Sequence, residues 1–571
     1  MRYTRIASAI LAGLLLMSCN NAGENDAPKT VETETASSNA ADVTAENDVP
    51  AENTTDESGD EEAPESNDTS SSDEAIPTVL QNQKHTLRFD ENGEFRIVVF
   101  GDVQAGAPAP CKETLDGIKT IVDRESPDLV LFAGDNSVGF SNEKALEKYL
   151  TSMTEYLEEN KIPWAHVYGN HDHEGGLSRE RQQVVYESFE YCVSQTGPDD
   201  IKGVGNYVLP VYPSDETRTD PVFSVWGLDS GAYVTDDGLV GREATLDNTM
   251  FRGHPGTTYA YMPFSQVKWY YDSSVEIEEF AGHKVPGLMY FHIPLQEFYE
   301  VWLNPEQTGV VGVKEDPVCS GPLNSGMFTA MIERGDIKAV CCGHDHINDY
   351  SGEFCGVKLC YASNIGFDTY HDADIMGGRV FTVKESDPDN VETYISYLYG
   401  MSLKNLKTSK DVTIGFEDPS LYTIEGGEAA DGAGVDGTVA AKLSEGESTI
   451  TTGEPFKINT GRYVRMWVDL TDGKIDAVTM NVLGGSAFKL KTESSDIFYL
   501  ADGETEWTTS PKGEALPDGF RGMIAFSAGA LRGVKDKREI PSKDTAVLGF
   551  AFTAEGTVYV DNIQMVSSYT K

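Results

Sequence analysis

The chain has 571 residues, a formal net charge of −49 and a hydrophobic fraction of 39%. It is too long for one ordinary domain, so we expect two folded units joined by linkers. So large a negative charge repels the backbones of nucleic acids, which argues against a nucleic acid partner.

An export signal is predicted at the start of the chain. Two arginines precede a short apolar run that ends at Leu16-Met-Ser-Cys19. The run is too short to span a bilayer and is typical of a cleaved signal peptide. Its last four residues resemble the bacterial lipobox, in which the cysteine is lipidated; the alternative is an ordinary signal with a chance cysteine. We therefore expect a signal over 1–19 and a protein lipid-anchored through Cys19 in the cell envelope, exposed outside the cytoplasm.

Residues 20–78 are predicted to form a disordered acidic stalk. They are rich in Asn, Ala, Glu, Asp, Ser and Thr, with almost no aromatic residues. Such a segment buries too little apolar surface to offset the cost of ordering its backbone, and its like charges repel one another.

Residues 85–400 alternate short apolar runs with amphipathic stretches. The predicted buried strands are 95–100, 129–132, 164–168, 288–291 and 339–342, and the predicted helices are 113–124, 142–159, 265–280 and 325–334. This alternation predicts an α/β core in which helices cover the sheets.

Residues 405–571 lose the helical period and read as several short strands separated by Gly, Asp and Ser turns. Strands are expected at 463–468, 523–526, 547–552 and 558–565. The pattern predicts an all-β, jelly-roll-like sandwich. Tyr463, Tyr499 and Trp507 either pack its core or lie exposed and stack on the sugars of a glycan.

Each predicted strand of the α/β region ends in a residue that can bind a metal. Gly101-Asp-Val-Gln104, Gly134-Asp135, Gly169-Asn-His-Asp172, His292 and Gly343-His-Asp-His346 follow the five strands in turn. Because functional groups in α/β sheets gather at the carboxyl ends of strands, these five loops are expected to meet in one pocket. Oxygen and imidazole donors together suit Fe, Mn, Zn or Co.

This series of motifs resembles the calcineurin-like metallophosphoesterases. Segments between the motifs, such as Gly205-Asn-Tyr207, Leu228-Asp-Ser230 and Phe291-His-Ile-Pro-Leu295, resemble one branch, the purple-acid-phosphatase-like proteins, some of which are labelled probable inactive. The resemblance covers about residues 90–385 and implies a four-layer αββα sandwich.

The resemblance also implies a pair of divalent or trivalent metal ions. The residues that would bind the first ion are Asp102, Gln104, Asp135 and His346, and those for the second are Asp135, Asn170, His292 and His344. Asp135 would bridge the two ions, which would activate a water for attack on phosphorus. Gln104 stands where most of the superfamily has histidine. No tyrosine follows Asp135 closely, so we expect no purple colour.

His171 is not among these ligands. In the resembling family this histidine contacts the phosphoryl group and helps to protonate the leaving oxygen, and Asp172 would orient it. The alternative is a structural histidine held by Asp172. Arg179 either binds the substrate phosphate or forms a salt bridge on a helix surface.

The leading interpretation is an extracellular phosphomonoesterase that acts on a small phosphate ester. A phosphodiesterase is the second, because the same two metals serve both reactions. The third is a surface glycan-binding protein whose phosphatase site has decayed. Gln104 is the only feature that favours this third interpretation.

Overall fold

The computed structural model describes residues 76–233, 259–458, 462–484, 487–542 and 545–570. The predicted signal peptide (1–19) lies outside these residues, and so does nearly all of the predicted stalk (20–78). Among the helices of the described residues, none combines the length and the apolarity that crossing a membrane requires.

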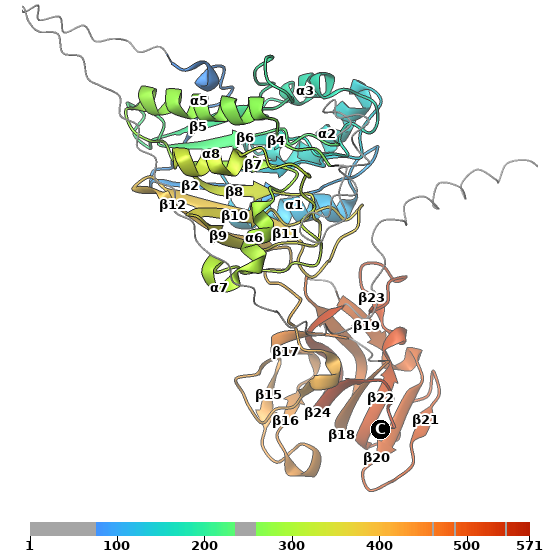
Figure 1. Cartoon of the computed structure of the whole chain (residues 1–571). Helices are drawn as coiled ribbons and strands as arrows, with labels where there is room; N and C mark the ends of the chain where they lie inside the picture. The colour runs from blue at the N-terminus through green and yellow to red at the C-terminus, as the bar shows by residue number, and fades with distance from the viewer. Residues whose placement is uncertain (1–75, 234–258, 459–461, 485–486, 543–544, 571) are drawn as a thin grey trace, which may run out of the picture. The chain divides into compact units, whose positions relative to one another are not determined.

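Two β-sheets build the α/β domain (Figure 1). One has seven strands in the order β1-β5-β6-β7-β8-β10-β9, and the other has five in the order β12-β11-β2-β3-β4. The larger sheet comprises β1 (Leu87–Arg88), β5 (Tyr207–Tyr212), β6 (Phe223–Gly227), β7 (Gly287–Phe291), β8 (Ile337–Cys342), β9 (Ser351–Phe354) and β10 (Val357–Tyr361). The smaller sheet comprises β2 (Glu94–Phe100), β3 (Leu129–Ala133), β4 (Trp164–Val167), β11 (Gly377–Lys384) and β12 (Asp387–Tyr397). Since β2, β3 and β4 are parallel, as are β7 and β8, their carboxyl ends share an edge within each sheet.

Alternation along the strands divides their side chains between two cores. In β2, Ile97 and Val99 belong to a core made by residues of both sheets. Val98 and Phe100, which point the other way, pack with residues of α1, α2 and α3. On the far side, strands of the larger sheet pack with α5, α6 and α8, and Figure 1 shows α5 and α8 along that sheet. These packing relationships confirm the predicted four-layer αββα sandwich.

The predicted helices and strands of this domain are confirmed. The helices are α1 (Lys112–Glu125), α2 (Glu143–Glu159), α3 (Arg179–Glu187), α5 (Phe264–Ala281), α6 (Glu297–Leu303), α7 (Pro305–Thr308) and α8 (Met327–Arg334), with a 3-10 turn η1 (Thr78–Leu80). Of these, α3, α6 and α7 were not predicted: α6 and α7 are short, and α3 consists mostly of polar residues.

The C-terminal part is all-β, as expected. Its strands are β13 (Thr413–Ile414), β14 (Tyr422–Glu425), β15 (Gly427–Ala430), β16 (Ala440–Leu443), β17 (Gly446–Lys457), β18 (Tyr463–Val482), β19 (Ala487–Lys491), β20 (Ile497–Ala501), β21 (Thr508–Ser510), β22 (Arg521–Ser527), β23 (Arg532–Gly533) and β24 (Ala546–Val566). Four 3-10 turns connect them: η2 (Ser409–Asp411), η3 (Val435–Gly437), η4 (Thr492–Ser494) and η5 (Ala528–Ala530). The strands enclose one apolar core.

The prediction of separate short strands at 547–552 and 558–565 was wrong. Both segments belong to β24, which pairs with β18 along most of its length. Gly556, in the expected turn between these segments, pairs with Gly473 of β18 close to an irregularity in the register between Asp469 and Asp472. Such an irregularity bends a strand without ending it, so a glycine there does not mark a turn.

Candidate active site

The five predicted loops come together at the carboxyl ends of strands from both sheets. Asp102, Asp135 and Asn170 follow β2, β3 and β4 of the smaller sheet. His292 follows β7, and His344 and His346 follow β8, both in the larger sheet. Every predicted oxygen ligand, Gln104 included, therefore comes from one sheet, and every predicted imidazole ligand comes from the other.

Backbone geometry at these positions is unusual. Asp102, Asp135 and His344 have φ angles of 53°, 48° and 78°. Residues other than glycine adopt the left-handed region at a cost, and such residues are concentrated at functional sites. The absence of a side chain at Gly169 lets the loop after β4 approach Asp135 closely, because a Cβ at Gly169 would lie 2.1 Å from Oδ1 of Asp135.

His292 lies at the centre of the cluster and is fully buried. Its Nδ1 lies 2.9 Å from the carbonyl oxygen of Ala133, which can only accept, so Nδ1 carries a proton. Its Nε2 lies 3.2 Å from Oδ2 of Asp135, 3.2 Å from Oδ1 of Asn170 and 3.1 Å from Nδ1 of His344.

His346 is oriented in the same way. Its Nδ1 donates to the carbonyl oxygen of Tyr370 at 2.8 Å. Its Nε2 is directed to Asp102, with 3.5 Å between this nitrogen and Oδ1. Backbone carbonyls that fix the tautomer of a histidine and leave its other nitrogen bare are typical of metal ligands.

Two sets of donor atoms result, and both contain Asp135. Asp135, His292 and His344 form one, and Asp102, Asp135 and His346 the other; within each set the ligand atoms lie within 4.8 Å of one another. Nε2 of His344 is buried and has no hydrogen-bond partner within the described residues. A cation would satisfy this nitrogen and the carboxylate and amide oxygens around His292, so the residues fit a metal pair.

The shifted pKa values of the buried carboxylates and imidazoles also fit a site for metal ions. Burial raises the pKa of Asp102. Burial also opposes the charged form of His292, but the carboxylates of Asp135 and Asp102 and the carbonyl of Ala133 together outweigh it and raise the pKa of this imidazole. A bound cation would instead favour ionised carboxylates and neutral imidazoles, which are the forms that bind metals.

Gln104 lies beside the cluster. Its backbone N–H donates to the carbonyl oxygen of Asp135 at 2.8 Å, and its side-chain oxygen accepts from the hydroxyl of Thr369 at 2.8 Å. A carbonyl oxygen has a second lone pair, so Gln104 as a metal ligand stays a prediction.

The expected contact between Asp172 and His171 is not present. The Asp172 carboxylate is fully buried and accepts from the backbone N–H groups of Gly169 and Ser137, at 2.8 and 2.9 Å. It therefore ties the loops after β3 and β4 together. The carboxylate beside the His171 ring is Glu174, whose Oε2 lies 2.9 Å from Nδ1.

His171 borders the metal cluster and reaches solvent. Its backbone N–H donates to Oδ1 of Asp135 at 2.8 Å, while its side chain is 34% exposed. Burial lowers the pKa of this imidazole, but the carboxylates of Asp135 and Glu174 together raise it above its ordinary value. The ring is thus placed and charged to hold a proton at the mouth of the site.

Several aromatic residues around the cluster were not predicted. The ring of Tyr370 stacks on His346 with centroids 4.1 Å apart, and the rings of Tyr259 and His344 meet edge to face with centroids 4.3 Å apart. Tyr233 lies between Asn170 and Glu174, to which its hydroxyl is hydrogen-bonded. These residues come from loops without a recognisable motif. Glu174 was not predicted either, although its position three residues after His171 could have indicated a partner for that ring.

Arg179 forms a salt bridge, but a buried one. Its Nη1 donates to both carboxylate oxygens of Asp229, at 2.7 and 2.8 Å, and its Nη2 donates to the carbonyl oxygen of Gly169 at 2.9 Å. The guanidinium therefore supports the loop that carries Asn170.

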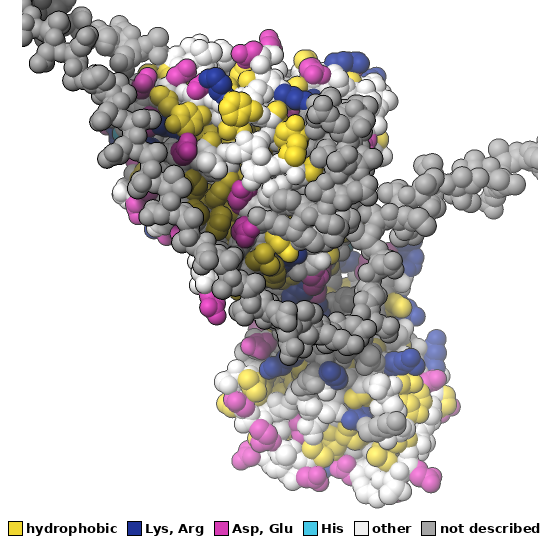
Figure 2. All heavy atoms as spheres, viewed as in Figure 1, with side chains coloured by type: hydrophobic (Ala, Val, Ile, Leu, Met, Phe, Trp, Pro, Cys, Tyr) yellow, Lys and Arg dark blue, Asp and Glu magenta, His cyan; other side chains and the backbone are white. Residues whose placement is uncertain are grey.

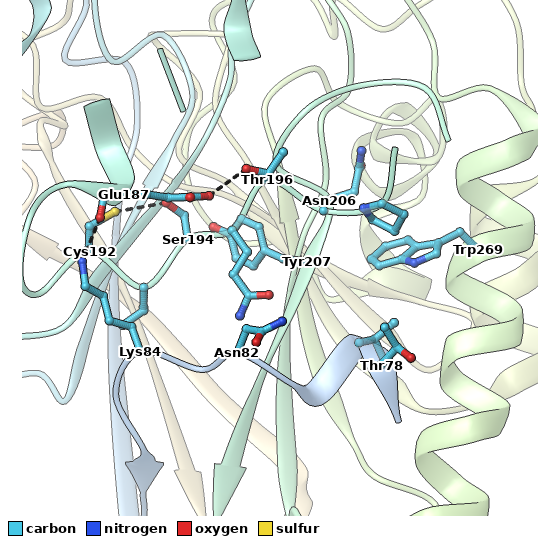
Figure 3. Close-up of a pocket in the computed structure, with 15 residues that line it drawn as sticks. Thr78, Asn82, Lys84, Glu187, Cys192, Ser194, Thr196, Asn206, Tyr207 and Trp269 are labelled. Carbon is cyan, nitrogen blue, oxygen red and sulfur yellow. Dashed lines mark hydrogen bonds between the residues drawn. The ribbon is translucent and has the colours of Figure 1, made fainter. Parts of the chain in front are cut away.

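A cavity of about 550 Å³ lies elsewhere in the domain (Figure 3). Trp269, Tyr207 and Asn206 line it together with residues of the 78–84 segment, and none of the predicted metal ligands does. Lys84 and Glu187, which also line it, are paired within the chain: the Lys84 ammonium donates to the carbonyl oxygen of Glu187, and the Glu187 carboxylate accepts from Thr196.

The fold and the two donor sets that share Asp135 fit a metallophosphoesterase domain with a site for two metal ions. Residues 95–348 match the family described as calcineurin-like phosphoesterase. The chain is 32% identical over 321 residues to the "Probable inactive purple acid phosphatase 14" of Arabidopsis thaliana, a match that covers 50% of this chain and 74% of the relative. The chain belongs to the calcineurin-like metallophosphoesterase superfamily, in its purple-acid-phosphatase-like branch.

Other relatives are similar over the same region. The "Probable inactive purple acid phosphatase 29" of Arabidopsis thaliana is 31% identical, with 52% of this chain and 77% of the relative covered. "Phosphatase DCR2" of Saccharomyces cerevisiae is 28% identical, with 46% of each chain covered. Among solved structures, a dimetal phosphatase from Danio rerio shares 15% identity at a TM-score of 0.34, over 53% of this chain and 99% of that one.

Proposed function

We propose that this protein is a metal-dependent phosphomonoesterase that hydrolyses a small phosphate ester outside the cytoplasm. The observation that carries the proposal is the pair of donor sets that share Asp135. A shared carboxylate has one oxygen for each of two ions and can hold them close together, as two-metal phosphoester hydrolysis requires.

The residues that would hold the metals are those that the family resemblance implies. Asp102, Gln104, Asp135 and His346 would bind one ion, and Asp135, Asn170, His292 and His344 the other. Iron, manganese, zinc or cobalt suits this mixture of oxygen and nitrogen donors. When bound, the ions supply an activated water and neutralise the phosphoryl oxygens.

His171 would hold the proton that the leaving group needs. With Nδ1 directed to Glu174, the second nitrogen, Nε2, is left for the substrate. As the oxygen of the incoming water bonds to phosphorus and the bond to the ester oxygen breaks, Nε2–H would give its proton to the departing oxygen, a contribution of typically about 10²–10⁴-fold.

The test is turnover of purified full-length protein together with metal analysis. We expect about two transition metal ions per chain and hydrolysis of monoesters in preference to diesters. Asn170→Ala should lose most of the activity and one of the ions, while Asn304→Ala, at an exposed site outside the cluster, should lose neither. Preferential turnover of diesters would replace the proposal with a phosphodiesterase.

A glycan-binding role with a decayed site is the second candidate, because two relatives are named probable inactive. In the C-terminal part, Tyr463, Phe498 and Trp507 surround Tyr569 with ring centroids 4.2–5.1 Å from it, and all four are partly exposed. Tyr499 instead packs against Phe520 of the core. Retention on polysaccharide that Trp507→Ala abolishes, with no metal bound, would favour this candidate.

Anchoring in the cell envelope rests on the lipobox-like end of the signal. Cys19→Ala should release the protein from the membrane fraction and remove label incorporated from radioactive palmitate. A nucleic acid partner is not proposed, because acidic side chains are interspersed among the basic ones on the face shown in Figure 2 and the charge is −49.

A further inference from the structure

Glu174 uses its two carboxylate oxygens for two different partners. Oε2 lies 2.9 Å from Nδ1 of His171, and Oε1 accepts from the hydroxyl of Tyr233 at 2.9 Å. The side chain is 41% exposed, so as a simple ion pair it would add little to stability. Two simultaneous partners beside the metal cluster suggest another role.

Tyr233 carries the connection to the metal cluster. Its hydroxyl has a single proton, which Glu174 accepts, so its oxygen faces Asn170 as an acceptor. Nδ2 of Asn170 donates to that oxygen at 3.2 Å. This directs the amide nitrogen to Tyr233 and leaves Oδ1 facing Nε2 of His292, 3.2 Å away.

We infer that Glu174 is a positioning residue that sets two groups at once: the ring nitrogen of His171 that meets the substrate, and the oxygen of Asn170 that meets the metal. By accepting from Nδ1–H, it leaves Nε2 of His171 for proton transfer to the leaving oxygen. Through Tyr233 it fixes the amide orientation of Asn170. The part of the inference that concerns His171 rests on the proposed function. The part that concerns the amide of Asn170 does not.

The kinetic test uses Glu174→Gln in the full-length protein. In glutamine one of the two carboxylate oxygens is replaced by an NH₂ donor, so either His171 or Tyr233 loses the oxygen that it faces. Outer partners of this kind are worth about 10–100-fold in activity or metal affinity. We expect that loss in kcat/KM on alkyl and phenyl phosphates and a much smaller loss on 2,4-dinitrophenyl phosphate, whose leaving group needs no proton.

Three companions make the kinetic result specific. His171→Asn should show the same dependence on the leaving group, and the double variant should lose little more than either single variant, because the residues act as a unit. Glu180→Gln, at another carboxylate of the same region, should match the wild type on all substrates. Equal loss on every ester in Glu174→Gln, or no loss, overturns the positioning role.

Two readouts do not depend on turnover. Tyr233→Phe should weaken metal binding at the Asn170 site by about 10-fold in competition with a chelator, and unchanged affinity would contradict the inference. In ¹⁵N imidazole spectra of the neutral form, His171 should carry its proton on Nδ1 in the wild type and on Nε2 in Glu174→Ala. If wild-type protein hydrolyses no ester, the proposed function fails while these two measurements still decide the role of Glu174.

Discussion

The ring of Tyr370 lies flat against the imidazole of His346, with an angle of 5° between their planes, and its backbone carbonyl accepts the proton of that imidazole. One residue thus holds a predicted metal ligand in two ways, although the residue itself is 56% exposed. Tyr370→Ala keeps the carbonyl and removes the stack, so it should weaken metal binding by about 10-fold. Competition with a chelator measures this effect; Tyr271→Ala, at an exposed tyrosine of α5, is the control. Unchanged affinity would show that the carbonyl suffices.

Metal removal should lower the thermal stability of the α/β domain. A ligand present at 100 times its Kd stabilises the folded state by about 2.7 kcal/mol. Calorimetry of the wild type should therefore show a lower Tm with EDTA than with added metal. Because Asp135 belongs to both donor sets, Asp135→Asn should abolish this difference, whereas Asp123→Asn, at an exposed pair with Lys119, should preserve it. A wild-type Tm that is the same with EDTA and with added metal would count against the metal pair.

The Arg179–Asp229 pair should behave as a buried ion pair. The two side chains are 14% and 0% exposed. Arg179→Met leaves the Asp229 carboxylate buried without its partner and should cost about 3–5 kcal/mol in the free energy of unfolding, measured by urea titration. The double variant Arg179→Met with Asp229→Leu should recover part of this loss. If Arg179→Met were stable but had a greatly raised KM, the guanidinium would instead bind phosphate.

Acid should destabilise the α/β domain through His166. Burial lowers the pKa of this histidine from 6.5 to about 3, and its ring stacks on Tyr186 with centroids 3.5 Å apart. Between these two pH values the unfolded chain binds a proton that the folded chain does not. Stability therefore falls as the pH drops below about 6.5, by up to about 1.4 kcal/mol per pH unit.

His166→Phe keeps an aromatic ring on Tyr186 and removes the proton. Urea titrations between pH 5 and 7.5 should give this variant a shallower dependence of unfolding free energy on pH than the wild type. His283→Gln, at an exposed site, should keep the wild-type slope. Equal slopes in His166→Phe and wild type would mean that His166 is not the group responsible.

The sequence predicted the parts of the site that depend on strand ends. Asp102, Asp135 and His292 each lie within two residues of the end of a buried apolar run, so the direction of the strand determines where they lie. Asp172 shows the limit of this reasoning. It neighbours His171 in the chain, yet its carboxylate is buried against backbone N–H groups of two loops, and no local pattern reveals that direction.

Tyr370 and Tyr233 could not be predicted for a related reason. They reach the site from loops far along the chain, where neither helical nor strand periodicity constrains the path. In the C-terminal part, Gly556 was read as a turn because glycine at positive φ is common in turns. The structure uses the same freedom for a bend within β24, a choice that the pairing with β18 determines.

The division of donors between the sheets has a mechanical consequence. The predicted oxygen ligands come only from loops of the five-stranded sheet, and the predicted nitrogen ligands come only from loops of the seven-stranded sheet. Each cation would therefore link the two sheets at one edge. The affinity for the ions would then depend on how the two sheets are aligned. A methyl group added to or removed from the core between the sheets, far from any ligand, would weaken metal binding before it measurably lowered the free energy of unfolding.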